Sequence, residues 1–493
     1  MTAAFAYDAV AYRTRPMGQF HPDRLDVVGR LFGLSPAPAE RCRYLEVGCG
    51  TGTHLIAAAL ALPAARFVGI DLSRTAIEAG RAAVAELGLA NVELAHADLT
   101  SWNPGPEPFD YIAAHGVYSW VPAPVRDRLL ALCGRALAPN GLAYISYNTY
   151  PGCRFREAVW DMLKFHTREA TDPPARISAA KEFITFLTAA QTDSDDPAAR
   201  LVMNWAKKAS DPDRVHWLYH DDLSEVNDPV YLLDFVRHAG EHGLRFAAEA
   251  VVMDMYPVGL PPLVCQVLAG LADQDLLLKE QYLDFVRLRS FRQTVLCRAG
   301  LEPRPEPNPT RVRELFVTTA AKQVCEPGPG VAFELRPGVR GRIDQPLPAA
   351  VLDALIDRSP GRLSFTELSH ACQAKAGSEG SDAGLVGVLF DLYTTGLIDL
   401  HGFRPAVPGA PGERPTASPL ARREAAAGAA VTTLYHTTVT LDEPIRRLVR
   451  LLDGTRDRAA IANEMRSVVP ADQLDANIDK SLAWLAKAGL LVS

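Results

Sequence analysis

YLEVGCGTGTHL, residues 44–55, joins a short apolar run to three alternating glycines, Gly48, Gly50 and Gly52. Glycines in such a turn let the backbone bend sharply and let its N–H groups approach a ligand closely. The spacing is GxGxG, which is neither the GxGxxG of a dinucleotide-binding fingerprint nor a P-loop, because no GK[ST] follows. Glu46 lies inside the apolar run, and a carboxylate there suits a ligand with a positive charge, such as an ammonium or a sulfonium.

Strands and helices alternate on both sides of this turn. Short apolar strands that alternate with helices are typical of a parallel sheet covered by helices on both faces, and they predict an α/β, Rossmann-like fold. Ligands bind such sheets at the carboxyl ends of the strands. The predicted strands are 44–47, 66–70, 91–94, 109–114 and 142–147, and the predicted helices are 53–62, 73–87 and 126–137, the last one ended by a Pro-Asn-Gly turn at 139–141.

Acidic residues follow the next two predicted strands. Asp71 closes the second strand, where a carboxylate accepts hydrogen bonds from a ribose diol. Asp98 follows the third strand, at a place where an adenine could lie. The alternative is that the glycines only form a tight strand–helix turn. With Glu46, carboxylates stand at three successive strand ends, which favours a nucleoside ligand that carries a positive charge.

These residues resemble the cofactor motifs of class I S-adenosylmethionine (SAM) methyltransferases: EVGCGTG at 46–52, Asp71, and Asp98-Leu99. The resemblance implies SAM as cofactor and S-adenosylhomocysteine as product. It also implies that the aromatic segment before the first strand folds over the cofactor. The cofactor-binding residues implied in this way are Tyr7, Tyr12, His21, Glu46, Gly48, Cys49, Gly50, Gly52, Asp71, Leu72, Asp98, Leu99 and His115.

A narrower resemblance extends over the first 300 residues. YDAVAYRTRPMGQFHPDRL (7–25), FDYIAAHGVYSWVP (109–122) and SYNTYPGC (146–153) are similar to bacterial methyltransferases that carry a methyltransferase regulatory domain. HDDLSEVNDPVYLLDFV (220–236) and QYLDFVRLRSFRQTVLC (281–297) look like segments of that regulatory domain. The group includes the rickettsial-type protein lysine methyltransferases, so the resemblance implies a protein amine as acceptor.

Methyl transfer from a sulfonium is an in-line displacement, so the protein must hold the acceptor, the methyl carbon and the sulfur in a line. An amine acceptor must also lose a proton before it reacts. Aromatic side chains could form a channel that attracts a cationic nitrogen. The alternative interpretations are that Trp120 is a core residue, His115 a cofactor contact and Asn148 a partner of loop backbone. The candidate catalytic residues, which follow the fourth and fifth strands, are His115, Tyr118, Trp120, Asn148 and Tyr150.

The chain is too long for one ordinary domain. We expect a methyltransferase core at 1–300, with helical insertions at about 154–217 and 261–289 and regulatory-domain segments within about 218–300. A helix at 229–242 and strands at 243–250 and 291–297, the last one antiparallel, would complete the sheet. After a Pro-rich boundary at 301–309 and around a linker at 404–419, two segments outline winged-helix-like α+β domains, with plain helical packing domains as the alternative. These segments are 310–400, with helices at 348–358, 364–372 and 383–395, and 425–493, with helices at 443–452, 457–465 and 472–488.

Composition narrows the class of protein. The 493 residues carry a formal net charge of −7, which argues against nonspecific nucleic-acid binding. We expect no membrane span, because no apolar run approaches the roughly 20 residues required, and no signal peptide, because the start lacks a basic and apolar pattern. The eight cysteines are scattered without a CxxC pair, so we expect no metal site and reduced thiols in a cytoplasmic protein.

We therefore expect a SAM-dependent methyltransferase that acts on a protein amine, with lysine as the first choice. Alternatives are a small-molecule or natural-product methyltransferase, and a SAM-binding regulatory protein without turnover. The C-terminal tail favours a macromolecular acceptor docked on the C-terminal domains, since a small molecule needs no docking surface. The fourth strand is followed by HGVY (115–118), which matches neither the motif of adenine- or glutamine-directed enzymes nor the cysteine of cytosine-C5 enzymes.

Overall fold

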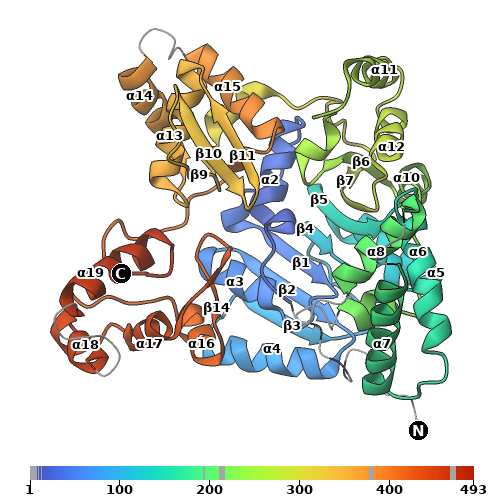
Figure 1. Ribbon diagram of the computed structural model, residues 1–493, viewed down its shortest axis with the longest axis horizontal. Coiled ribbons are helices and arrows are strands. Elements are labelled where there is room, and N and C mark those ends of the chain that lie inside the picture. The colour runs from blue at the N-terminus through green and yellow to red at the C-terminus, as the bar shows by residue number, and fades with distance from the viewer. Residues whose placement is uncertain are drawn as a thin grey trace.

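The computed structural model describes residues 8, 10, 12, 14–191, 195–209, 217–376, 382–466 and 474–493. At its centre lies a seven-stranded sheet in the order β3-β2-β1-β4-β5-β7-β6 (Figure 1). Neighbouring strands from β3 to β5 are parallel, and β7 runs antiparallel to both β5 and β6. The predicted fold class and the antiparallel last strand are thus confirmed. The strands are β1 (Arg43–Val47), β2 (Arg66–Asp71), β3 (Val92–His96), β4 (Phe109–Ala114), β5 (Leu137–Asn148), β6 (Leu244–Glu249) and β7 (Phe291–Arg298).

Helices cover both faces of the sheet. Side chains of alternate strand positions, such as Tyr111 and Tyr144, pack with α2, α3 and α4 on one face. Their neighbours Ile112 and Ile145 pack with α5 and α10 on the other face. This alternation buries the central strands on both sides, as expected for a parallel sheet. The covering helices are α2 (Pro22–Leu31), α3 (Thr53–Ala61), α4 (Arg74–Glu86), α5 (Ala123–Ala136) and α10 (Leu232–Glu241).

One strand boundary differs from its prediction. The turn expected at 139–141 lies inside β5, which begins at Leu137, directly after α5 ends at Ala136. The pairing of β4 with β5 shifts between Phe109 and Tyr111, which face Leu137 and Leu142. This irregularity accommodates the Pro-Asn-Gly residues within an extended strand instead of requiring a separate turn before it.

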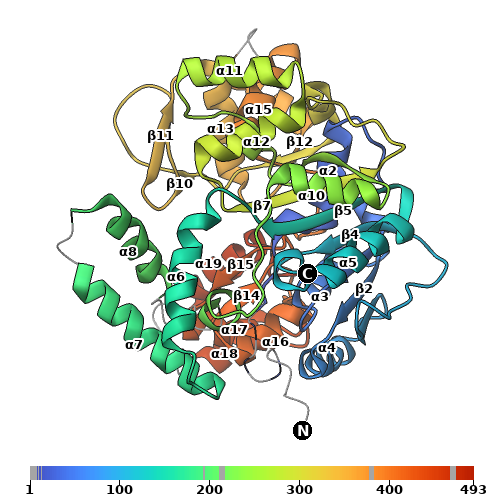
Figure 2. The ribbon, with the colours of Figure 1, turned by 90° about the vertical axis from the view of Figure 1, so that its right-hand side faces the viewer.

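Two helical insertions leave the sheet at the carboxyl ends of its parallel strands. The first follows β5 and contains α6 (Cys153–His166), α7 (Pro173–Gln191) and α8 (Pro197–Ala209). The second lies between β6 and β7 and contains α11 (Pro262–Ala272) and α12 (Leu276–Arg287). Figure 2 shows α6, α7 and α8 grouped on one side of the molecule and α11 and α12 at another. Among the described residues, no helix is both long and apolar enough to cross a membrane.

The chain then forms two smaller helical and β units, drawn in orange and red in Figure 1. The first has the sheet β12-β8-β13 and a second small sheet, β11-β10-β9. Its elements are β8 (Phe316–Thr318), β9 (Lys322–Gln323), β10 (Val331–Arg336), β11 (Val339–Ile343), α13 (Pro346–Arg358), β12 (Leu363–Ser364), α14 (Phe365–Ala376), α15 (Asp382–Thr394) and β13 (Asp399–His401).

The second unit has its own hydrophobic core. It begins with α16, a helix that was not predicted from the sequence. The Pro-rich run before this helix had been interpreted as a linker. Ser418 caps this helix by accepting a hydrogen bond from Ala421 N at 3.1 Å. The elements are α16 (Pro419–Ala427), β14 (Ala430–Thr432), β15 (Thr438–Thr440), α17 (Glu443–Leu451), α18 (Arg458–Met465) and α19 (Leu474–Lys487). The expected start of α19 at 472 falls outside the described residues. The division of the chain into domains stays a prediction.

The first of these units is packed firmly on the sheet domain. Asp23 of α2 is buried, and its carboxylate accepts hydrogen bonds from Arg362 Nη1 at 3.1 Å and from Gly402 N at 2.6 Å. It also lies 2.6 Å from His401 Nδ1. One continuous hydrophobic core joins α2 and the sheet to α13 and α15. Residues 310–403 are therefore part of the same body as the sheet, and not a flexible tail.

A buried arginine holds the antiparallel edge of the sheet together. The fully buried Arg292 of β7 pairs with Glu249 of β6 at 2.7 Å, and with Asp284 and Glu280 of α12 at 2.8 and 3.3 Å. The carboxylates accept hydrogen bonds from the planar guanidinium of Arg292. Its N–H donors point in several directions, so one arginine can pair with several carboxylates. This cluster therefore connects β7, β6 and α12.

Arg292→Met should lower the free energy of unfolding by roughly 3–5 kcal/mol, because it leaves Glu249 and Asp284 buried without their cation. Urea denaturation followed by circular dichroism measures the change. Arg245→Met on β6 is the matched control: its pair with Glu302 is largely exposed and contributes no more than about 1 kcal/mol. Equal losses in the two variants would contradict a structural role for the buried cluster.

Candidate functional site

The glycine turn after β1 has a backbone that side chains would block. Gly48, Gly50 and Gly52 have φ values of 76°, 56° and 69°, in the left-handed region that favours glycine. A Cβ on Gly48 would lie 2.8 Å from Val117 Cγ2, and one on Gly50 would lie 3.1 Å from Thr14 Cγ2. The turn therefore fits tightly between the segment before the sheet and the loop after β4, and its backbone forms the floor of a cavity.

Asp71, at the carboxyl end of β2, fixes this turn. Its Oδ2 accepts a hydrogen bond from Gly50 N at 2.8 Å, and its Oδ1 accepts one from Ser73 N at 2.7 Å. Burial raises the pKa of Asp71, and the two backbone hydrogen bonds act against that rise. A carboxylate has about four acceptor positions, so Asp71 keeps capacity for ligand hydroxyls.

Glu46 is buried, and one of its carboxylate oxygens lacks a partner among the described residues. Only 6% of its surface is exposed, and Oε2 has no hydrogen-bond partner within the described part of the chain. Burial raises its pKa well above the usual range, and Asp71 adds to the rise. A buried carboxylate of this kind is costly unless a cation pairs with it. Glu46 therefore fits the ammonium group of a bound SAM molecule, with Asp71 placed for the ribose hydroxyls.

A cavity of about 660 Å³ opens above these residues. This volume is within the range of small-molecule sites. The candidate residues that line it are Tyr12, Glu46, Gly48, Cys49, Gly50, Asp71, His115, Trp120 and Asn148. The structure thus brings together the glycine turn, both carboxylates and three of the five candidate acceptor residues.

His115 is held inside the cavity wall. Its Nδ1 lies 2.9 Å from Tyr144 Oη, and its ring stacks on Phe20 with centroids 5.0 Å apart. Burial lowers the pKa of His115 to about 4. The imidazole is therefore neutral near pH 7, and its fixed orientation suits a positioning role more than a role as base.

Two of the candidate acceptor residues lie elsewhere. Tyr118 does not line the cavity: its hydroxyl lies 2.9 Å from His238 Nδ1, and its ring packs against Phe235. Tyr150 donates a hydrogen bond to Glu157 Oε1 at 2.6 Å and also lies outside the cavity wall. Tyr118 and Tyr150 thus lie outside the cavity wall, because strand-end loops can turn a side chain to either side, and their part in catalysis stays a prediction.

Several candidate cofactor residues also lie outside the cavity wall. His21 caps α2 by accepting a hydrogen bond from Asp23 N at 3.1 Å. Gly52 precedes α3. Leu72 is 45% exposed. Asp98 is exposed, and hydrogen bonds from Thr100 lower its pKa. Leu99 packs beside the core on the α5 face. Tyr7 lies outside the described residues, so its place in the site stays a prediction.

A second wall of the cavity contains none of the residues that the sequence predicted for the site. This wall comes from the first helical insertion and from η5 (Leu218–Asp222), a short π-helical turn. Asp222 accepts hydrogen bonds from Arg156 Nη2 at 3.0 Å and from Trp160 Nε1 at 2.8 Å. The Asp-Asp pair within HDDLSEVND was a visible signal, but helical periodicity did not show which face would meet the cofactor half. The lining residues of this wall are Arg156, Trp205, Trp217, Asp221 and Asp222.

Asp221, in this wall, has a pKa far above the usual value for an aspartate. Burial raises its pKa to about 7, while Arg156 acts against the rise and Asp222 adds to it. On the other side of the cavity, Trp120 Nε1 is buried with no partner within the described residues. The acceptor half thus combines aromatic rings with a carboxyl group that can exchange a proton near neutral pH.

The C-terminal unit reaches the cavity wall through a histidine pair. His54 of α3 lines the cavity, and His436, between β14 and β15, places Nε2 2.9 Å from His54 Nδ1. Burial lowers the pKa of both imidazoles well below the usual value. Two neutral rings can share one hydrogen bond, so this contact joins residues 413–493 to the cofactor half of the site.

Three family models match parts of the chain. A methyltransferase domain matches residues 45–141, a predicted methyltransferase regulatory domain matches 214–298, and a PKMT C-terminal winged helix domain matches 413–485. The first model covers the glycine turn, Asp71 and His115. The third covers the unit that carries His436.

Proteins of Rickettsia show similarity over longer stretches. Two uncharacterised proteins of Rickettsia prowazekii are 36% identical over 299 residues and 33% identical over 238 residues. The matches cover 60% and 48% of this chain, about half (53%) of the first relative and 95% of the second. The structure is similar to that of PKMT2 from Rickettsia typhi, with a TM-score of 0.86 at 23% identity, over 98% of this chain and 100% of that one. PKMT2 has also been solved in complex with AdoHcy, with a TM-score of 0.85.

Glu46→Gln should weaken SAM binding about tenfold or more, because the amide cannot pair with an ammonium group. Its stability without ligand should hold, since the neutral amide resembles the protonated carboxyl that a raised pKa implies. In the wild type, SAM affinity should rise with pH, because a cation binds the ionised carboxylate and the raised pKa keeps a proton on it at lower pH. The variant should lose this dependence.

Isothermal titration calorimetry over a range of pH tests both statements. Glu93→Gln, an exposed change on β3, is the control and should bind SAM as the wild type does. Unchanged affinity in Glu46→Gln would remove Glu46 from the cofactor site.

Proposed function

This chain belongs to the class I SAM-dependent methyltransferases, and from that premise we propose that it transfers the methyl group of SAM to an amine of a protein, with a lysine side chain as the expected acceptor. The observation that carries the proposal is the two-sided cavity. One wall offers the glycine turn, Glu46 and Asp71, and the opposite wall offers aromatic rings and Asp221. PKMT2, whose fold this chain shares, and the PKMT winged helix model both support a protein acceptor.

The acceptor wall suits a cationic amine on physical grounds. Trp205 and Trp217 line this wall, Trp120 lines the cavity from the loop after β4, and aromatic rings attract an ammonium group by about 0.5–2 kcal/mol. Asp222 of this wall is paired with Arg156 at 3.0 Å, and Asp221 adds a further carboxyl group to it. A cation gains the attraction to the aromatic rings and to the carboxyl group in addition to burial, so the wall favours an amine over an uncharged acceptor.

The same residues account for the proton that an amine must lose. Bound SAM supplies an electrophilic methyl group on a sulfonium. Asp221 would take the proton that the ammonium must lose before its nitrogen lone pair can accept the methyl group, with S-adenosylhomocysteine as the leaving group. With a pKa of about 7, Asp221 is ionised in a useful fraction of molecules near neutral pH and can return the proton to water. His115, neutral and fixed, keeps the cofactor half in place.

Transfer of a radiolabelled methyl group from SAM into a cell lysate tests the proposed acceptor class. Label should enter the protein fraction and appear as methyllysine after hydrolysis. Label confined to small molecules would support a small-molecule methyltransferase instead. Absence of label despite SAM binding would support a regulatory protein without turnover.

Asp221→Asn should lower kcat by about 10²–10⁴-fold and leave SAM affinity unchanged, because the amide keeps the shape but cannot take a proton. In the wild type, kcat should rise as pH increases through about 7, since the carboxylate form is the base, and the variant should lose this rise. Glu225→Gln, an exposed change in the same segment, is the control. A wild-type rate and pH profile in Asp221→Asn would contradict the assignment.

We also propose that the protein acceptor docks on the C-terminal units. Trp484 of α19 is 45% exposed and lies beside Leu441 and Ile445 around a small surface pocket. Tryptophan is enriched among the residues that dominate protein–protein binding. An exposed tryptophan next to further apolar side chains supports a contact surface for the acceptor protein.

Trp484→Ala should raise the KM for the protein acceptor about tenfold or more and leave the Kd for SAM unchanged. Val492→Ala is the matched control, because Val492 is 44% exposed in the same unit and lies outside this pocket. Steady-state kinetics with the methylated protein identified from lysate measures both values. Equal KM values in the wild type and Trp484→Ala would place docking elsewhere.

A further inference from the structure

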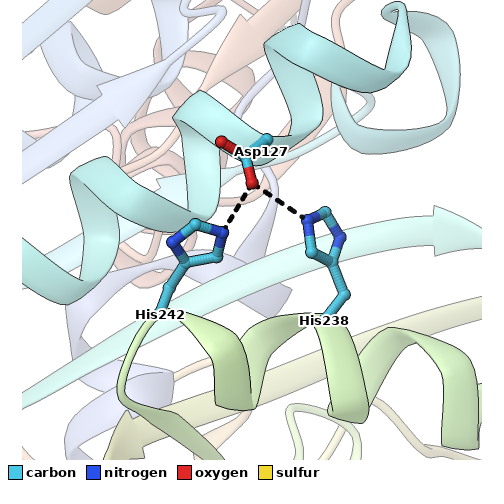
Figure 3. Close-up of side chains that lie close together, drawn as sticks. All are labelled: Asp127, His238 and His242. Carbon is cyan, nitrogen blue, oxygen red and sulfur yellow. Dashed lines mark hydrogen bonds and ion pairs between the residues drawn. The ribbon is translucent and has the colours of Figure 1, made fainter.

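Two histidines and an aspartate converge away from the cofactor cavity (Figure 3). His238 lies in the last turn of α10, and His242 is the residue that directly follows the helix, so the two rings lie close together with centroids 5.5 Å apart. Asp127 faces them from α5, the other helix that covers this side of the sheet. Asp127 Oδ1 lies 2.9 Å from His242 Nε2 and 3.6 Å from His238 Nε2.

Tyr118 orients the imidazole ring of His238. The Nδ1 atom of this ring lies 2.9 Å from the hydroxyl of Tyr118. In the tautomer with its proton on Nδ1, this nitrogen donates to Tyr118 Oη, and the Nε2 lone pair is left as a ligand on the side of Asp127. Histidine ligands of metals are typically oriented in this way, by a partner that binds the second ring nitrogen. This contact also accounts for the position of Tyr118, which does not line the cavity.

We propose that Asp127, His238 and His242 bind a divalent transition metal, with zinc as the ion of choice and solvent in the remaining position. One donor atom from each residue lies within 4.8 Å of the other two. Ligands around zinc at about 2.0–2.2 Å stand roughly 3.3–3.6 Å from one another in a tetrahedron, so small side-chain rotations complete the geometry. Imidazole nitrogens with one carboxylate form a donor set suited to zinc.

The surroundings favour a cation at this place. A metal binds imidazole in its neutral form, so two histidine ligands and one carboxylate would bring a single negative charge to the ion. The nearby guanidinium groups are paired elsewhere, Arg126 with Asp228 at 2.6 Å and Arg237 with Asp234 at 2.9 Å. The side chains of Asp127, His238 and His242 are 53%, 25% and 17% exposed, so an ion can enter and keep a water ligand.

A metal here would fasten α5 to α10 behind the acceptor wall. α5 follows η3 (Tyr118–Trp120), and Trp120 lines the cavity. Ser119 of the same turn accepts a hydrogen bond from Asn148 N at 2.9 Å through its hydroxyl. The site therefore stabilises the turn that carries Trp120, and it does so whichever acceptor the enzyme uses.

Zinc titration of the full-length, chelator-treated protein tests the site. Calorimetry with ZnCl2 should show one equivalent bound with a dissociation constant in the micromolar range or below. Asp127→Asn should weaken binding at least tenfold, and the double variant His238→Ala/His242→Ala should abolish it. His370→Ala, which removes an exposed histidine on α14, should leave it unchanged.

Two further measurements keep the result interpretable. Melting temperatures in chelator should be alike for the wild type and Asp127→Asn, which shows that the variant folds, and zinc should raise the value only where the site is intact. Cobalt bound by the wild type should show the visible absorption of a four-coordinate ion, and the double variant should not. Zinc binding of equal strength in the wild type and the double variant, or none in the wild type, would show a histidine–aspartate ion pair without a metal and would overturn the proposal.

Discussion

The buried cluster around Arg292 is the constraint on which the ligand-facing edge of the sheet depends. Lys279, Arg289 and Arg292 are matched there by the carboxylates of Glu249, Glu280 and Asp284. The three cations and three carboxylates neutralise one another where little water reaches them. Removal of any one of them would leave a buried unpaired charge and destabilise the fold. The cluster fixes β7 between β5 and β6. Phe291 and Ser290, which precede Arg292, line the cavity at that edge.

The cavity joins parts of the chain that have different structural origins. The cofactor half is built from strand ends, where Asp71 holds the glycine turn by a hydrogen bond to Gly50 N. The acceptor half is built from insertion helices, which form a small core of their own around Leu163 and Ile184. His436 adds a contact from the C-terminal unit to the cofactor half. A bound acceptor would therefore meet surfaces supported by three separate cores.

The strand-end residues of the cofactor half could be predicted because their positions follow from topology. In a parallel sheet the carboxyl ends of neighbouring strands meet at one edge, so Glu46 and Asp71 had to lie close together. The direction of loop side chains has no such rule. Tyr118 and Trp120 are two residues apart on one short turn, yet Trp120 faces the cavity and Tyr118 faces His238. Asp98 follows its strand as expected, but its carboxylate is used by Thr100 within its own loop.

The sequence by itself determined the kind of sheet, the antiparallel last strand, the glycine turn and the cationic nucleoside ligand. These features depend on local properties: the apolar period, the φ values that only glycine adopts readily, and the charge at a strand end. Only the tertiary structure decided the acceptor wall and the histidine–aspartate cluster. His238 and His242 share a helix face in the sequence, but Asp127 reaches them because α5 and α10 pack on the same side of the sheet. Packing of this kind depends on the shape and burial of many side chains at once, so no single stretch of sequence contains it.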